Sequence, residues 1–131
     1  MNREIIVPWE WQEKLDFVPA NKITSGESVL YCAGQVSLDG DGALLYAGNM
    51  EAQLNQALDN LEVVLEQAGA KLSDVVRLNY YTTDVSEFYK ANHIVGERLK
   101  KGNCRPVSTL LGVASLFHPD IVIEIEATAV F

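Results

Sequence analysis

The sequence predicts an α+β fold in which a single mixed β-sheet carries two helices on one face. Segments with the composition of strands occupy both ends and the middle of the chain. Two segments with helical periodicity lie on either side of the middle strand. Because two helices cover only one face of such a sheet, the other face needs cover from elsewhere. The pattern is therefore compatible with an oligomer.

The first third of the chain contains three segments that resemble strands. A short run at residues 4–8 is expected to form the first, and residues 28–37 and 43–46 the next two. Between the second and third runs, the sequence Asp39-Gly40-Asp41-Gly42 predicts a turn.

The first helix is expected between Asn49, a suitable N-cap, and Gly69, which is placed to end it. Its apolar residues recur every three or four positions and predict a buried stripe: Leu54, Ala57, Leu58, Leu61, Val64, Leu65 and Ala68. Its polar residues are expected to face solvent: Gln53, Gln56, Asp59, Glu62 and Glu66.

Residues 75–82 predict the middle strand, and a second helix follows it. Asp84 and Glu87 have the spacing of a capping pair at the start of this helix. Lys100, Lys101 and Gly102 suit its carboxyl end. Its apolar stripe consists of Phe88, Ala91, Val95 and Leu99.

The last 28 residues contain two apolar runs of strand type on either side of a turn at residues 118–120. In the final run, alternation puts Glu124 and Glu126 on one face, and the isoleucines at 121, 123 and 125 on the other. Two acids in an apolar strand need water, a partner or a chemical role. Arg105, near the start of the preceding run, is a candidate partner for them or for the carboxylate of a ligand.

Composition narrows the class of protein. A length of 131 residues fits one domain, residues 1–131, and a hydrophobic fraction of 48% is enough for a core. Eighteen acids against ten bases give a net charge of −8, which disfavours nucleic acid as a partner. Neither a membrane-spanning run nor a secretory signal is recognisable, so a cytoplasmic protein without a membrane partner is expected.

The cysteines and histidines do not predict a metal site. Cys32 and Cys104 lie in or beside apolar segments, as expected for reduced, buried thiols. His93 falls on the second predicted helix and His118 in a turn, and their spacing is not that of metal ligands.

The ordered set of motifs resembles the Rid family, also called the RidA/YjgF family of reactive-intermediate deaminases. The resemblance covers nearly the whole chain after about the first fifteen residues. The segments that match the family pattern are Ala33-Gly34-Gln35, residues 53–69, residues 73–92, Arg105-Pro106, Leu110, Leu116 and Ile123-Glu124-Ile125-Glu126-Ala127.

This resemblance implies a chorismate-mutase-like homotrimer with sites in the clefts between subunits. It implies hydrolysis of enamines and imines of the 2-aminoacrylate and 2-iminobutanoate type to 2-oxo acids and ammonia, without a metal or cofactor. By resemblance, Arg105 binds the substrate carboxylate and Glu124 positions the attacking water. The family's other substrate contacts correspond to Val107, Gly34, Asn92 and Phe17, and Glu126 corresponds to a structural acid.

Several departures from the family pattern keep other functions open. Val107 stands where the best-known deaminases have cysteine, Ala33 replaces a serine, and Phe17 replaces a tyrosine. The segment 93–104 also looks shorter. A trimer that binds a small carboxylate or metabolite without turnover is one alternative, and a pathway-specific deaminase with another substrate is a second. Arg105 and Glu124 could also form a structural ion pair. Trp9 and Trp11 have no assigned role.

Overall fold

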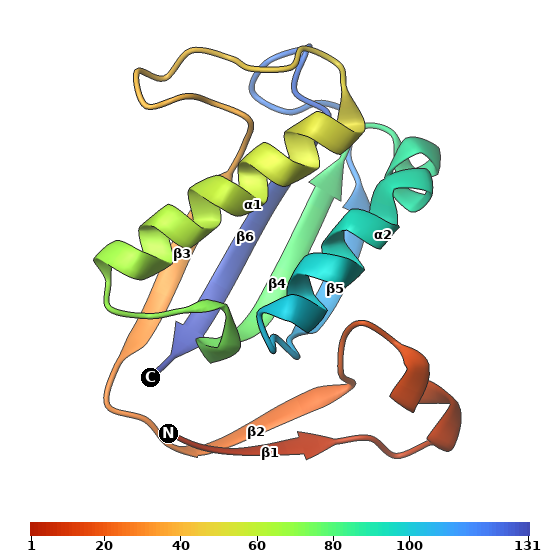
Figure 1. Ribbon diagram of the computed structural model, residues 1–131. Coiled ribbons are helices and arrows are strands. Elements are labelled where there is room, and N and C mark those ends of the chain that lie inside the picture. The colour runs from red at the N-terminus through yellow and green to blue at the C-terminus, as the bar shows by residue number, and fades with distance from the viewer.

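The computed structural model describes residues 1–131 and has two layers, a four-stranded sheet and two helices on one of its faces (Figure 1). The strand order is β3 (Val29–Gln35), β6 (Ile123–Val130), β4 (Val75–Thr82) and β5 (Val107–Gly112). β4 and β5 are parallel, whereas β6 is antiparallel to both of its neighbours. Helices α1 (Met50–Gln67) and α2 (Val85–Lys101) cover the same face. The predicted class, a mixed sheet with two helices on one face, is confirmed.

The N-terminal segment forms a second, two-stranded sheet, which corrects the expectation of a single sheet. β1 (Asn2–Ile6) pairs with β2 (Ala20–Ser25), and the short helix η1 (Glu10–Lys14) lies between them. β2 is not among the predicted strands because its sequence, A-N-K-I-T-S, has one apolar side chain of strand type. Arg3 fixes this hairpin to the main sheet, since its guanidinium donates to the carbonyl oxygens of Ser73 at 3.0 Å and Arg105 at 2.9 Å.

The expected strand at residues 43–46 is wrong, although the turn before it is confirmed. Only one bridge, between Leu38 and Leu44, connects this segment to the preceding one. The Asp39 carboxylate accepts hydrogen bonds from the backbone N–H groups of Asp41 and Ala43, both at 2.9 Å. The chain therefore folds back on Asp39 and does not continue as a ladder.

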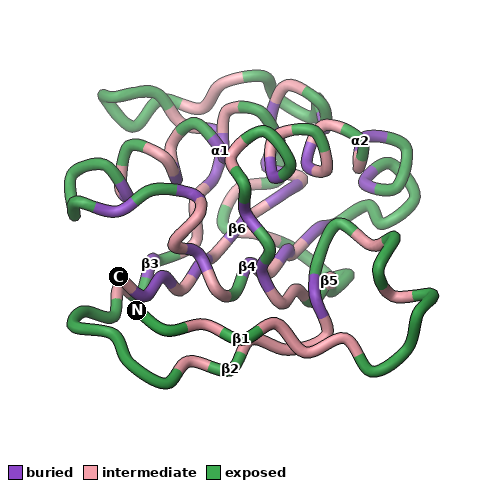
Figure 2. The backbone as a smooth tube through the Cα atoms, turned by 60° about the horizontal axis from the view of Figure 1, so that its bottom comes forward, coloured by how far each residue is buried: buried purple, intermediate pink, exposed green.

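The core lies between the helices and the sheet (Figure 2). In β6, Ile123, Ile125, Ala127 and Ala129 are buried, as the alternation predicts. Glu124 and Glu126 point to the opposite face, which no helix of the chain covers.

Both predicted helix starts are confirmed by their capping hydrogen bonds. The Asn49 side chain accepts from the N–H of Ala52 at 3.1 Å, and the Asp84 side chain accepts from Glu87 at 3.0 Å. α1 ends before Gly69, whose φ of +82° is a conformation that glycine adopts without strain. The chain then passes through the short helix η2 (Leu72–Asp74) into β4.

One of the polar expectations for α1 is corrected by the structure. Gln53 is fully buried instead of solvated. Its amide donates to the carbonyl oxygens of Tyr46 at 2.9 Å and Asp120 at 2.7 Å, and its oxygen accepts from the N–H of Val122 at 2.9 Å. Asp59 and Glu62 face solvent as expected, and both form ion pairs with Arg98 on α2. Helical periodicity in the sequence cannot distinguish a solvated glutamine from one whose side chain forms hydrogen bonds with the backbone of nearby loops.

We expect Gln53→Ala to lower the free energy of unfolding by about 2–4 kcal/mol, because it removes three hydrogen bonds of a fully buried side chain, among them the one that the Val122 N–H donates, and leaves a cavity. Urea unfolding followed by circular dichroism measures the change. The matched control is Gln67→Ala on the same helix, where the side chain is exposed, and a change within about 0.5 kcal/mol is expected. Equal effects for the two substitutions would contradict the role assigned to Gln53.

Cys32 and Cys104 are free and buried, which confirms the expectation of reduced thiols. Burial raises the pKa of Cys104 to about 12, so this thiol stays protonated and weakly nucleophilic. No cluster of three metal-ligating side chains occurs. Neither helix combines the length and apolarity that crossing a bilayer requires.

Candidate active site

The predicted site residues lie in two separate places in the folded structure. Arg105, Val107, Phe17 and Asn92 lie around the edge strand β5 and the adjacent part of α2. Glu124 lies on β6, two strands further into the sheet, against Gly34 of β3. One chain therefore presents two half-sites.

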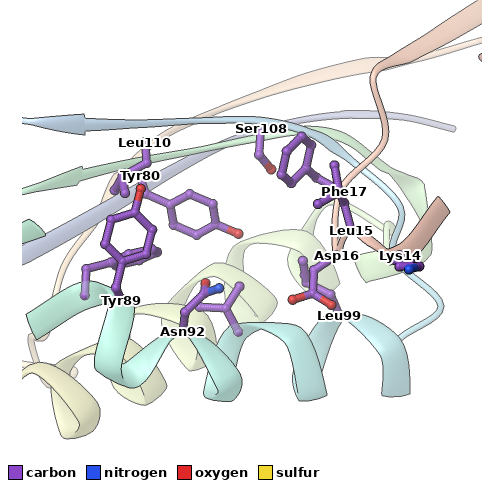
Figure 3. Close-up of a pocket in the computed structure, with 12 residues that line it drawn as sticks. Lys14, Leu15, Asp16, Phe17, Tyr80, Tyr89, Asn92, Leu99, Ser108 and Leu110 are labelled. Carbon is purple, nitrogen blue, oxygen red and sulfur yellow. The ribbon is translucent and has the colours of Figure 1, made fainter. Parts of the chain in front are cut away.

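The edge half-site consists of hollows that adjoin one another. Phe17 and Asn92 line a pocket of about 430 Å³ between residues 14–17, α2 and the sheet (Figure 3). Arg105 lines a second hollow, also about 430 Å³. The two hollows share four lining residues, Lys14, Leu15, Asp16 and Leu99. Phe17 also contributes to a third hollow, which contains Val107. The structure thus brings four of the six predicted residues to one edge of the molecule.

The Arg105 guanidinium is exposed, and no ion pair of the chain includes it. Its backbone is fixed, because the Arg105 carbonyl oxygen accepts hydrogen bonds from the side chains of Arg3 at 2.9 Å and Asn21 at 3.1 Å. A free guanidinium on an anchored backbone is suited to bidentate binding of an incoming carboxylate.

Within one chain, Arg105 and Glu124 cannot contact the same small molecule. Tyr81 of β4 is opposite both Leu111 of β5 and Glu124 of β6. Glu124 is therefore level with a residue six positions beyond Arg105, about 20 Å along the strand direction. β4 also separates the two strands. The alternative of a structural ion pair between these residues is wrong for a single chain.

The Glu124 carboxylate packs against Gly34. A Cβ atom at position 34 would overlap Oε1 of Glu124 and lie 2.6 Å from its carboxyl carbon. The two residues line a hollow of about 270 Å³ together with Tyr81, Val113, Leu116 and Glu126. No ion pair of the chain includes Glu124. Glycine is thus required at position 34 for the carboxylate to lie where it does.

Glu126 has a different environment and is held by protein groups. Its Oε1 accepts hydrogen bonds from the Tyr81 hydroxyl and, at 3.3 Å, from the Asn79 amide. The hydrogen bond to Glu126 raises the pKa of Tyr81. These contacts match the structural role that the family resemblance implies for Glu126.

We expect Gly34→Ala to reduce any activity that depends on Glu124 by at least about tenfold, because the added methyl displaces the carboxylate. The fold should persist, because the substitution lies on the helix-free face and Glu124 is a side chain that can move. Gly40→Ala is the matched control, since a Cβ at position 40 meets no atom within 4 Å. Steady-state kinetics with thermal melting measures both effects.

Sequence reasoning missed two polar residues of the edge pocket, Tyr80 and Ser108. The alternation of β4 puts Tyr80 on the same face as Leu78, and a tyrosine on a buried face signals a polar neighbour. Ser108 is opposite Leu78 in the parallel β4–β5 pair. That pairing is not readable from the sequence, so the two hydroxyls could not be placed together in advance.

This chain has a mixed sheet with two helices on one face, and its candidate groups lie on the sheet edge and on the open face. These features are those of small α+β proteins of chorismate-mutase-like shape. Within that class, the family model described as Endoribonuclease L-PSP matches residues 16–131. A RutC family protein of Pyrococcus horikoshii is 32% identical over 111 residues, which cover 85% of this chain and 86% of that protein. The 3-aminoacrylate deaminase RutC of Acinetobacter baylyi is 28% identical over 130 residues, 98% of each chain.

A solved structure of similar shape is the Rid family protein YyfB of Yersinia pestis, described as a protein of unknown function. It is 33% identical, with a TM-score of 0.86 over 100% of both chains. The chain therefore belongs to the Endoribonuclease L-PSP family, the family of the RutC and Rid proteins. The family assignment from the sequence motifs is confirmed.

Proposed function

We propose that this protein hydrolyses reactive enamines and imines of the 2-aminoacrylate and 2-iminobutanoate type to 2-oxo acids and ammonia. The observation that carries the proposal is a pair of opposite charges, Arg105 and Glu124, that no ion pair within the chain uses. Both coincide with the residues to which the family resemblance gives chemical roles. The deaminase among the relatives supports the same reaction class.

The chemistry needs few groups. The Arg105 guanidinium holds the substrate carboxylate, and the backbone N–H of Val107, the first residue of β5, is a further donor two residues along the chain. Glu124 orients a water and accepts its proton as oxygen adds to the imine carbon and the C=N electrons move to nitrogen. Glu124 then returns the proton to nitrogen. The C–N bond breaks and ammonia leaves as the hydroxyl oxygen gives its proton to Glu124 and becomes the carbonyl of the 2-oxo acid. The protonated imine carbon is already strongly electrophilic, so no metal or organic cofactor is needed in this scheme.

The separation of the half-sites within one chain makes assembly part of the proposal. The helix-free face exposes large apolar side chains, including Tyr31 at 80%, Val29 at 54% and Leu111 at 50%. Asn79 Oδ1 on the same face is buried and has no hydrogen-bond partner. Covering such a face with another copy is favourable. In the proposed homotrimer, Glu124 of one copy meets Arg105 of the next across a cleft.

Asn92 and Phe17 complete the edge half-site in this proposal. Asn92 supplies an uncharged donor and acceptor from α2, and Phe17 supplies an apolar wall. The absence of hydroxyls at Phe17 and Ala33 leaves these positions with contact but no hydrogen bond to substrate.

The direct test is release of ammonia from 2-aminoacrylate generated in place by a pyridoxal-phosphate dehydratase. Purified protein should accelerate release above the spontaneous rate, and light scattering should give three times the chain mass. Saturable binding of a 2-oxo acid without any acceleration would favour the second candidate, a non-catalytic binding trimer. That candidate is favoured by the lost hydroxyls at positions 17 and 33.

RNA cleavage, the activity that the family description names, is not the function we propose. A net charge of −8 opposes phosphate binding, and the helix-free face carries two carboxylates. The cytoplasmic location expected from the sequence remains a prediction.

A further inference from the structure

The pocket between α2 and the sheet combines apolar walls with hydroxyl groups on its inner surface. Phe17, Phe88 and Leu110 supply apolar surface. The Tyr80 and Ser108 hydroxyls reach in from the sheet, and the Asn92 amide reaches in from the helix (Figure 3). Lys14 and Asp16 also line the pocket, and the Asp16 carboxylate lies against Gly96 of α2. The pocket is therefore polar, and the groups that reach in from the sheet are uncharged hydroxyls.

One of the two hydroxyls of the sheet has no hydrogen-bond partner within the chain. Ser108 Oγ is buried and makes no hydrogen bond within the chain. Tyr80 is only 6% exposed. Burial raises the pKa of Tyr80, and the nearby Ser108 hydroxyl opposes that shift only in part, so the phenol stays protonated. Because nearly all buried polar groups in folded proteins have a partner, the Ser108 hydroxyl indicates a ligand group that supplies one.

The pocket adjoins the hollow of Arg105, with which it shares Leu15 and Leu99 among other residues. We infer that it is the side-chain subsite of the substrate, and that Tyr80 and Ser108 select a ring-sized side chain ending in a hydrogen-bonding group without negative charge. This inference rests on the proposed function, in which Arg105 holds the carboxylate. Anionic side chains are disfavoured, because the Asp16 carboxylate borders the pocket. Small apolar side chains leave the Ser108 hydroxyl unpaired.

The test is binding of two 2-oxo acids that differ by one oxygen, (4-hydroxyphenyl)pyruvate and phenylpyruvate, measured by isothermal titration calorimetry. The wild-type protein should bind the hydroxylated acid about tenfold more tightly, as expected for one additional hydrogen bond. Tyr80→Phe and Ser108→Ala should each reduce this preference to about threefold or less. Tyr80→Phe keeps the ring that packs on Phe88 at a centroid distance of 5.4 Å, so folding should be retained.

Tyr46→Phe is the matched control, because it removes an exposed tyrosine hydroxyl that does not line the pocket. It should keep the wild-type preference. Equal affinity of the wild-type protein for the two acids, absence of binding by both, or a preference that survives Tyr80→Phe and Ser108→Ala would overturn the inference. A retained preference without turnover of 2-aminoacrylate would support the subsite and reject only the proposed deaminase activity.

Discussion

Arg105→Ala is expected to lower kcat/KM for 2-aminoacrylate by about 10²- to 10⁴-fold while the protein stays folded. The side chain would make two charge-assisted hydrogen bonds to the carboxylate, each of about 1.5–3 kcal/mol. The structural contacts of residue 105 come from its carbonyl oxygen, which Arg3 and Asn21 bind, and the substitution leaves that oxygen in place. Ammonia release at several substrate concentrations measures the loss, and thermal melting verifies the fold.

Two further arginine variants test whether the loss of activity comes from the planar guanidinium and from Arg105 in particular. Arg105→Lys keeps the charge but loses the planar fork, so an intermediate activity is expected. Arg77→Ala removes an exposed arginine of β4 that no ion pair uses. If Arg77→Ala lost as much activity as Arg105→Ala without a change in oligomer mass, the carboxylate would be assigned to the wrong arginine.

Glu124→Gln is expected to reduce kcat by about 10²- to 10⁴-fold, because an amide of the same shape cannot accept the proton of the attacking water. The paired variant is Glu126→Gln, two residues along the same strand. Its carboxylate already binds Tyr81 and Asn79, so its loss should affect stability more than turnover. Rate measurements on both variants, with unfolding curves, separate the two acids. A larger loss of turnover from Glu126→Gln would reverse their roles.

The parts of the fold that follow from local chemistry could be predicted from the sequence. Both helix caps, the apolar stripes and the two faces of β6 depend on residue spacing alone, and all are present except at Ala68, which is exposed at the end of α1. The separate N-terminal hairpin could not be predicted, because β2 has little apolar periodicity and depends on side-chain bonds such as those of Arg3 and Asn21 to distant carbonyl oxygens. Gln53 was misread for a related reason, since its partners lie in loops that only the fold brings near.

For the candidate site too, short motifs identify single residues, but they do not show which of these residues the fold brings together. Motifs nominate Arg105 and Glu124 individually, but their separation follows from the strand order, which puts β4 between β5 and β6. The strand order depends on packing across the whole sheet, so no short motif predicts it. Tyr80 and Ser108 were not recognised because they meet in the pocket only through the parallel pairing of β4 and β5.

The most direct test of the central claim, a site shared between copies, is complementation between two inactive variants. Arg105→Ala and Glu124→Gln chains with different affinity tags are co-expressed, and mixed oligomers are isolated through both tags. If each site takes Arg105 from one copy and Glu124 from the next, every mixed trimer contains one intact site, about one third of the wild-type number. Ammonia release should recover to about that level, while each variant alone stays inactive. Mixed oligomers that remain as inactive as the parents would contradict the shared site.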